Sequence, residues 1–163
     1  MNSGEEWKSS TDLMSSHTMK RYRIEVSKGR FKIFGFVQEV GKDILVALWG
    51  GVRPHIGAIG IAIPRPSLKD PKRWSATSSN FTITGHKEDI LVKTISEKLA
   101  SVLRKVVVVT AGIHWDGMTS KDITVVETLA KRIPNQVLSK ISPGPGAIDH
   151  QDKEGTPHRQ KRR

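Results

Sequence analysis

The sequence lacks cysteine altogether, and this absence excludes several classes of protein. Without a thiol the chain cannot carry a disulfide framework, a thiolate zinc site, an iron–sulfur cluster or a cysteine nucleophile. Aromatic residues are also few, with one tyrosine, four phenylalanines and four tryptophans. Stacking of single-stranded nucleic acid needs aromatics interleaved with basic side chains. The two segments that come closest, residues 30–34 and 69–74, match no recognition module, so nucleic-acid binding is disfavoured.

Long hydrophobic runs are absent as well. The longest ones, residues 44–49 and 106–109, are far shorter than the roughly eighteen apolar residues of a membrane helix. The first twenty residues contain no apolar run of the length that a signal peptide needs. We therefore expect a cytoplasmic protein that does not enter a membrane. Phosphate-binding loops, dinucleotide fingerprints and the Gly-x-Ser-x-Gly elbow of hydrolases are also missing.

Positive charge is what the chain has in excess. It contains 27 basic and 16 acidic residues, which give a formal net charge of +11. Most of this charge falls between residues 21 and 142 and not in a terminal arm. Such a surface attracts nucleic acid, a phosphorylated small molecule or an acidic protein partner, and charge alone does not choose among them.

Composition predicts one folded domain between two disordered ends. Residues 1–20 are polar and rich in serine and threonine, and residues 143–163 follow a Pro-Gly-Pro-Gly stretch with a charged, basic tail. Neither segment has enough apolar residues to build a core. The domain is therefore expected at residues 21–142, a length that can fold without disulfides or metals.

Hydrophobic periodicity predicts an α+β fold. Alternating or continuous apolar patterns indicate strands at 22–26, 31–38, 44–49, 59–63, 81–84 and 106–113, and spacings of three and four indicate helices at 88–104 and 119–134. Thr119 and Asp122 have the spacing of a capping box, and Pro134 should end or kink the second helix. Residues 64–79, rich in proline and basic side chains, are expected to form a surface loop. Consecutive hairpins favour a mainly antiparallel sheet of about six strands with two helices on one face.

Three segments at predicted strand ends combine glycine with histidine, namely 50–57, 85–89 and 110–116. Glycine allows a backbone to approach a ligand closely, and the last two segments lead into helix starts, which favour anions. We expect these two segments, with Arg53, His86 and Lys87, to hold a phosphate or flavin phosphate. His55 and His114 would hydrogen-bond a ring system, and Trp115 or Trp49 would stack on it. The candidate binding residues are Gly50, Gly51, Arg53, His55, Gly57, His86, Lys87, Gly112, His114 and Trp115.

Other interpretations of the same residues stay open. Each segment taken alone fits an ordinary turn or helix cap. His55, His86 and His114 would suit a three-histidine zinc site, although no pair has the close spacing of a strong metal motif. Glu88, Asp89 and Asp116 could serve acid–base chemistry if buried together, but carboxylates at helix starts are more often caps.

The three segments in this order resemble the prenylated-flavin chaperone family, which includes the small D proteins associated with gallate and phenolic-acid decarboxylases. The resemblance rests on Gly50-Gly51 with Pro54-His55-Ile56-Gly57, on His86-Lys87-Glu88-Asp89, and on Thr110-Ala111-Gly112-Ile113-His114. It spans roughly residues 22–135. The basic segment 64–79 and the basic tail depart from the family pattern, which leaves the partner surface open.

The resemblance implies a domain like the small proteasome-assembly chaperones and a homodimer. It also implies a non-catalytic accessory protein that binds prenylated FMN, or FMN, and delivers it to a UbiD-type decarboxylase. His55, His86, Lys87 and His114, with their glycines, are the residues carried over. Two rivals remain: an enzyme or decarboxylase subunit that uses a three-histidine site with or without a metal, and an assembly chaperone for a protein partner without any ligand.

Overall fold

The computed structural model describes residues 20–141, which contain six strands and three helices. The terminal segments that composition predicts to be disordered, 1–20 and 143–163, lie outside the described residues except for Lys20. The elements in chain order are β1 (Arg21–Lys28), β2 (Phe31–Val40), β3 (Asp43–Gly51), β4 (Ala58–Pro66), β5 (Trp74–Thr82), α1 (Asp89–Leu103), β6 (Val107–His114), α2 (Ser120–Ala130) and α3 (Ile133–Ile141). No helix of this part of the chain is long and apolar enough to cross a membrane.

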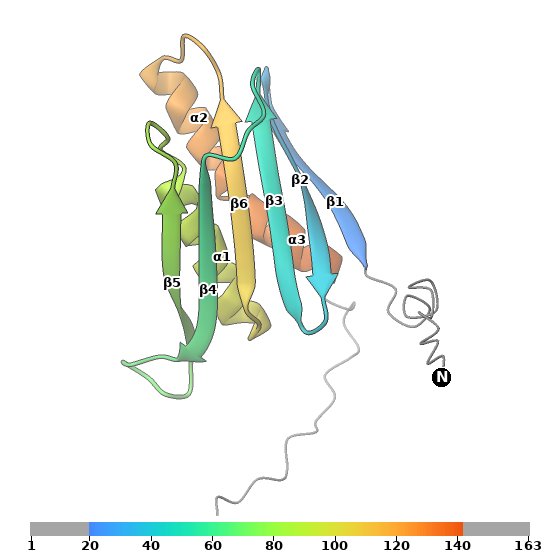
Figure 1. Cartoon of the computed structure of the whole chain (residues 1–163), viewed down its shortest axis with the longest axis vertical. Coiled ribbons are helices and arrows are strands. Elements are labelled where there is room, and N and C mark those ends of the chain that lie inside the picture. Colours follow the sequence, from blue (N-terminus) through green and yellow to red (C-terminus); the bar gives the residue numbers. More distant parts are fainter. Residues whose placement is uncertain (1–19, 142–163) are drawn as a thin grey trace, which may run out of the picture.

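The six strands form one sheet in the order β1-β2-β3-β6-β4-β5 (Figure 1). Strands β1, β2 and β3 follow one another as antiparallel neighbours, and β4 and β5 form a second antiparallel pair. The last strand, β6, lies between them, parallel to β3 and antiparallel to β4. The prediction of a mainly antiparallel sheet is confirmed.

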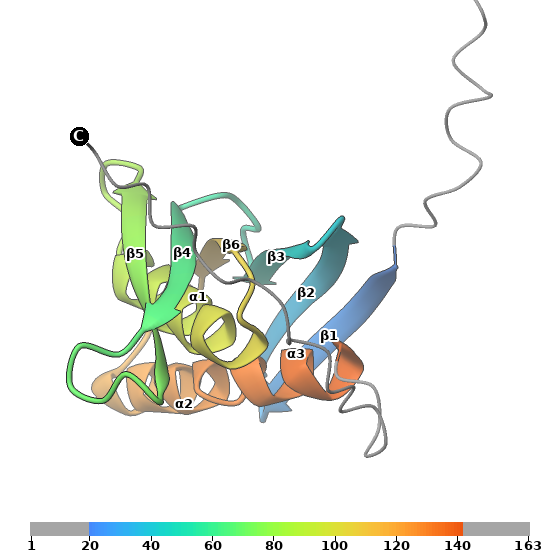
Figure 2. The same ribbon diagram turned by 90° about the horizontal axis from the view of Figure 1, so that it is seen from below.

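All three helices cover one face of the sheet (Figure 2). Helix α1 packs against β4, β5 and β6, while α2 packs against β1 and β2, and α3 packs against β1 and α1. The expected α+β class, with helices on one face, is therefore confirmed. The second predicted helix ends at Ala130, and a new helix, α3, starts at Ile133 with Pro134 in its first turn. Proline is tolerated there because the first turn needs no backbone N–H donor.

The core lies between the sheet and the helices. Alternate residues of the inner strands, such as Val46, Val107 and Val109, are fully buried and meet Leu99 of α1 and Val137 of α3. Strands that alternate buried and exposed positions need a covering layer on one face only. This pattern explains why one layer of helices is sufficient.

Two apolar helix residues expected to face the core are instead about half exposed. Val102 of α1 is 49% exposed and Ile123 of α2 is 48% exposed. The buried face of α1 is formed by Val92, Ile95, Ser96, Leu99 and Ala100. The apolar spacing in the sequence, Leu91, Ile95, Leu99 and Val102, therefore predicts only part of the stripe that faces the sheet. Ile123 lines a groove between the helices.

The prediction of a surface loop at residues 64–79 is wrong. Residues 64–66 belong to β4 and residues 74–79 to β5, so the loop is limited to 67–73. Strand β5 lies at the sheet edge and carries serine, threonine and asparagine without apolar alternation, so its sequence has no periodic strand pattern. Pairing with β6 stops at Ala62, so Pro64 and Pro66 lie where β4 has only one neighbour and the missing N–H groups cost little.

The capping box at the start of α2 is confirmed. The Asp122 backbone N–H donates to Thr119 Oγ1 over 3.3 Å, and the Thr119 N–H donates to Asp122 Oδ2 over 3.0 Å. The Thr119 backbone N–H and hydroxyl both donate to the Asp122 carboxylate, which holds the pKa of Asp122 below its usual range. The N-terminus of α2 is therefore fixed locally, which also fixes the segment that follows β6.

Replacing Leu99 by alanine should lower the free energy of unfolding by about 2 to 5 kcal/mol, because the side chain is fully buried between α1 and the sheet. Urea unfolding followed by circular dichroism would measure the change. The matched control is Val102→Ala on the same helix, where the half-exposed side chain should cost no more than about 0.5 kcal/mol. Equal losses for both variants would contradict the packing described here.

Candidate functional site

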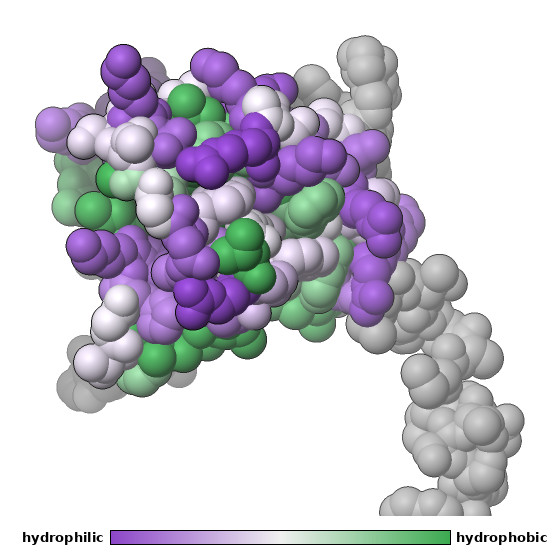
Figure 3. Space-filling view, turned by 90° about the horizontal axis from the view of Figure 1, so that it is seen from above, coloured by the Kyte–Doolittle hydropathy of each residue, from purple (hydrophilic) through white to green (hydrophobic). Residues whose placement is uncertain are grey.

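All ten candidate residues lie at one end of the sheet. Strands β3 and β6 run parallel side by side, so their carboxyl ends meet there, with Gly50 opposite Ile113 and Gly51 opposite His114. Strand β4 starts at the same end, and the β5–α1 connection returns there because Ala58 pairs with Thr82. Figure 1 shows the β3–β4 loop crossing β6 at this end. We call this region the loop end; seen along the strands, its surface mixes polar and apolar side chains (Figure 3).

Three side chains of the loop end form a histidine–glutamate cluster, consisting of His55, His86 and Glu88. His55 Nε2 lies 3.0 Å from His86 Nδ1 and 3.6 Å from Glu88 Oε1. His86 Nδ1 lies 3.7 Å from Glu88 Oε2. The rings approach with centroids 4.5 Å apart. Two loops far apart in sequence therefore converge on one small polar centre.

The carboxylate of Glu88 is held by backbone donors. Its Oε1 accepts from the Ile113 N–H over 3.1 Å, and its Oε2 accepts from the Lys87 N–H over 3.0 Å. Glu88 occupies the N-cap position of α1, but its side chain makes no capping hydrogen bond. With an exposed fraction of 11%, the carboxylate is the most buried member of the cluster. Its role is to join the α1 start to the end of β6 and to face the two histidines.

Two glycines allow the cluster to close. A Cβ atom on Gly57 would lie 2.5 Å from Glu88 Oε2 and 3.1 Å from His55 Nε2. A Cβ atom on Gly112 would overlap the backbone carbonyl of His55. The β3–β4 loop can therefore lie directly on β6 and bring His55 to Glu88 only because both positions lack a side chain.

The third predicted histidine belongs to a separate group. His114 Nε2 lies 2.9 Å from Asp116 Oδ1, and Arg53 Nη2 donates to the same oxygen over 2.6 Å. The hydrogen bond with His114, together with the Arg53 guanidinium, holds the pKa of Asp116 below its usual range. All three side chains are well exposed, so this ion pair contributes little to stability.

Trp115 turns to the helical face of the sheet. Its ring packs edge-on against Phe31 with centroids 5.2 Å apart. Trp49, the other tryptophan considered for stacking, packs with Phe36 of β2 at 6.1 Å and takes no part in the loop end. Trp115 is therefore the available ring, but it faces a groove and not the histidines.

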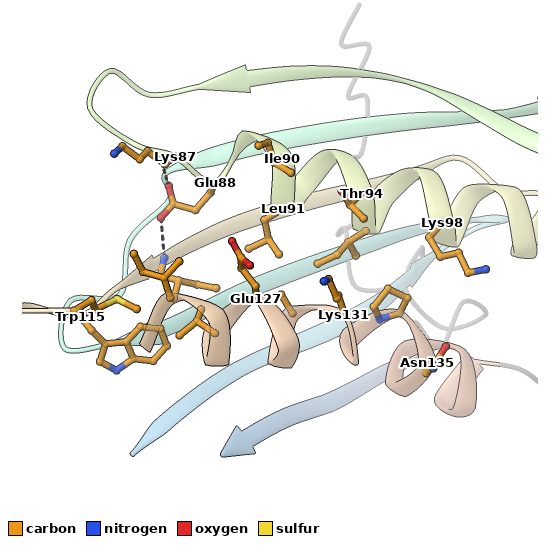
Figure 4. A pocket seen from close by; sticks show the side chains of 17 residues that line it. Lys87, Glu88, Ile90, Leu91, Thr94, Lys98, Trp115, Glu127, Lys131 and Asn135 are labelled. Carbon is orange, nitrogen blue, oxygen red and sulfur yellow. Dashed lines mark hydrogen bonds between the residues drawn. The ribbon is translucent and has the colours of Figure 1, made fainter. Parts of the chain in front are cut away.

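This groove, which we call the helix groove, runs between α1 on one side and α2 and the start of α3 on the other (Figure 4). It has a volume of about 690 Å³. Its apolar lining includes Leu91, Ile95, Ile113, Trp115, Val126, Ala130 and Pro134, and its exposed lysines are Lys87, Lys98 and Lys131. Lys87 and Glu88 line one end of the groove, so it adjoins the histidine–glutamate cluster.

The structure thus divides the candidate residues. Only Lys87 and Trp115 line the helix groove, whereas the other eight form the loop end beside it. The three-histidine arrangement considered from the sequence is not formed, because His114 is bonded to Asp116 and Glu88 takes the third position. Glu88 was considered only as an acid–base group or helix cap. The one local signal was that His86 and Glu88 both fall in the short connection between β5 and α1.

Comparison with known proteins shows which family the chain belongs to. The family model of the prenylated flavin chaperone LpdD-like domain matches residues 27–142. Protein LpdD of Lactiplantibacillus plantarum (strain ATCC BAA-793 / NCIMB 8826 / WCFS1) is 21% identical over 115 residues, which cover 71% of this chain and 81% of that protein. A chain in the crystal structure of a chaperone complex for yeast 20S proteasome assembly aligns with a TM-score of 0.49 and 9% identity, over 77% of this chain and 100% of that one. Because the family model covers most of the sequence and confirms the resemblance of the three glycine–histidine segments, the chain belongs to the prenylated flavin chaperone LpdD-like family.

Proposed function

We propose that this protein is a non-catalytic carrier that binds prenylated FMN and delivers it to a UbiD-type decarboxylase. The family description names a prenylated flavin chaperone, and Protein LpdD is a relative over most of its length. The observation that carries the proposal in this chain is the helix groove, an apolar groove with exposed lysines on its walls. The experiments below test the ligand and its position separately.

The helix groove has the size and chemistry of a site for an amphiphilic anion. Its volume of about 690 Å³ lies within the range of about 300 to 1,000 Å³ that is usual for small-molecule sites. A prenylated isoalloxazine is a flat, largely apolar ring system, which suits Leu91, Val126 and the ring of Trp115. The phosphate is an anion, which the lysine ammonium groups attract. An amphiphilic anion of this kind therefore matches both the apolar lining and the lysines of the helix groove.

The lysines favour one end of the groove for the phosphate. Lys98 of α1 and Lys131 after α2 line the part that lies away from the cluster, as Figure 4 shows. At the other end the single lysine, Lys87, has the carboxylate of Glu88 beside it, whereas Lys98 and Lys131 share the groove with one carboxylate, that of Glu127. We therefore place the phosphate toward Lys98 and Lys131 and the ring toward Trp115 and the loop end.

The loop end then provides polar groups beside the ring. Arg53, His55, His86 and His114 lie there with exposed or partly exposed side chains. A carrier must release its ligand, and a groove that is open along one side leaves part of the ligand accessible to the receiving enzyme. The homodimer expected from the resemblance stays a prediction, and the mass of the purified protein in solution would test it.

The test of the ligand is an anaerobic titration of the full chain with prenylated FMN, with FMN as the control. We expect saturable binding of about one prenylated FMN per chain and binding of FMN that is weaker by at least about tenfold, because FMN lacks the apolar prenyl-derived ring. Isothermal titration calorimetry and the change in flavin fluorescence would both report it. Absence of saturable binding to prenylated FMN would reject the proposed function.

Delivery is tested separately. Protein loaded with prenylated FMN should activate an apo-decarboxylase of the UbiD type faster than the same amount of free cofactor. A loaded carrier that slows activation would show storage without delivery.

A further inference from the structure

We propose that His55, His86 and Glu88 bind one divalent transition-metal ion, for which Zn²⁺ is the best fit. The histidine–glutamate cluster combines two imidazoles and one carboxylate from two loops at one end of the sheet. These side chains occupy the space beside Gly57 that a side chain on that residue would need. This site adjoins the proposed flavin position, and it is tested without any flavin.

The spacing of the ligand atoms fits a four-coordinate zinc ion. Zinc bonds of about 2.0 to 2.1 Å in a tetrahedron hold neighbouring ligand atoms about 3.3 Å apart. The two histidine nitrogens are 3.0 Å apart, and each lies close to one carboxylate oxygen of Glu88, His55 Nε2 at 3.6 Å from Oε1 and His86 Nδ1 at 3.7 Å from Oε2. One ligand atom from each of the three side chains lies within 4.8 Å of the other two, so small side-chain movements let one ion reach all three.

The hydrogen bonds around the cluster prepare the ligands. His55 Nδ1 lies 2.8 Å from the Arg53 carbonyl oxygen, which can only accept, so Nδ1 carries the proton. In the neutral ring this leaves the lone pair on Nε2, the nitrogen that faces His86 and Glu88. Such a carbonyl partner on the second ring nitrogen is the usual arrangement for a metal-binding histidine.

Glu88 is prepared in the same way. Its two oxygens each accept one backbone N–H, from Ile113 and from Lys87, so the carboxylate is fixed in orientation. Each oxygen keeps a further lone pair for a cation. In the metal-free protein a hydrogen bond between His55 and His86 requires one proton between the two nitrogens, and the metal replaces that proton.

The cluster leaves room for a fourth ligand. The side chains of His55, His86 and Glu88 are 24%, 33% and 11% exposed, so the centre is reached from solvent. Three protein ligands and one open position are typical of zinc sites that bind water or an anionic oxygen. A set of two imidazoles and one carboxylate also accommodates Co²⁺ and Ni²⁺, which provide useful probes.

The test is titration of the full chain, freed of metal by a chelator, with Zn²⁺ followed by calorimetry and with Co²⁺ followed by visible absorption. We expect one Zn²⁺ per chain with a dissociation constant on the order of 1 μM or lower, and Co²⁺ absorption bands typical of four-coordinate geometry. His86→Ala and Glu88→Gln should each weaken Zn²⁺ binding at least tenfold and abolish those bands. His86→Ala is less prone to destabilise the fold than Glu88→Gln, because the His86 side chain is a third exposed. The Glu88 carboxylate, in contrast, accepts hydrogen bonds from two backbone N–H groups.

The matched control is His114→Ala, which removes one histidine of the loop end from outside the cluster. It should bind Zn²⁺ as the unaltered protein does. Histidines 17, 150 and 158 are unchanged in every variant, so any background binding by them is common to all samples. Absence of Zn²⁺ binding, full binding by His86→Ala that retains the native melting temperature, or equal loss in His114→Ala would overturn the assignment.

Discussion

Thr94→Trp is expected to weaken binding of prenylated FMN on the order of 100-fold, which corresponds to about 2.8 kcal/mol. Thr94 lies on α1, is exposed and lines the helix groove, so a tryptophan there fills the space that we assign to the flavin ring. Threonine and tryptophan have similar helix propensities, so α1 itself should be unaffected. Anaerobic titration would give the dissociation constant, and circular dichroism would verify the fold.

The matched control for this substitution is Val102→Trp. Val102 is also exposed on α1, but it lies outside the groove, so the affinity should stay within about twofold of that of the unaltered protein.

Lys98→Glu should reduce the affinity for prenylated FMN about tenfold, because it reverses a charge beside the expected phosphate. Normal binding by Thr94→Trp, with weak binding by His55→Ala and His114→Ala, would place the flavin at the loop end instead.

Gly51→Ala is expected to lower the free energy of unfolding by about 2 to 5 kcal/mol, the largest stability effect at the loop end. Gly51 has a φ of 82°, where a residue with a side chain is strained by roughly 1 to 2 kcal/mol. A Cβ atom there would also lie 2.5 Å from the carbonyl carbon of His114 and still closer to its oxygen. The alanine would force β3 and β6 apart, at a cost of about 1 to 3 kcal/mol for overpacking.

Gly41→Ala separates the two contributions. Gly41 has a φ of 58°, but a Cβ atom on it would meet nothing within 4 Å. This variant should therefore lose only the strain of roughly 1 to 2 kcal/mol. Urea unfolding of both variants measures the difference, which reports the contact between β3 and β6. If both variants lost the same stability, the close contact at Gly51 would be refuted.

The composition of the candidate site was partly predictable. The three glycine–histidine segments do meet at one end of the sheet, and Gly57 and Gly112 have the role of close backbone approach for which glycine was singled out. Periodicity could not foresee that the Glu88 side chain would leave the helix start and bond to Ile113. Nor could it foresee that His114 would pair with Asp116, because side-chain directions at loop ends depend on contacts between distant segments.

The sequence by itself determined the local elements and the family. Apolar spacing predicted α1, the Thr119–Asp122 pair predicted the start of α2, and the ordered motifs of the loop end indicated the prenylated flavin chaperones. These features depend on neighbouring residues, whose interactions are set by backbone geometry and hydrophobic period.

Only the tertiary structure decided the rest. The insertion of β6 between β3 and β4 brings together the loops that form the histidine–glutamate cluster. The polar edge strand β5 exists because β4 offers it a partner, and the helix groove exists because the apolar faces of α1 and α2 do not close on each other. The physical reason is that strand pairing and the packing of helices on a sheet are stabilised by contacts between segments far apart in the chain. A local pattern can permit such contacts without specifying them.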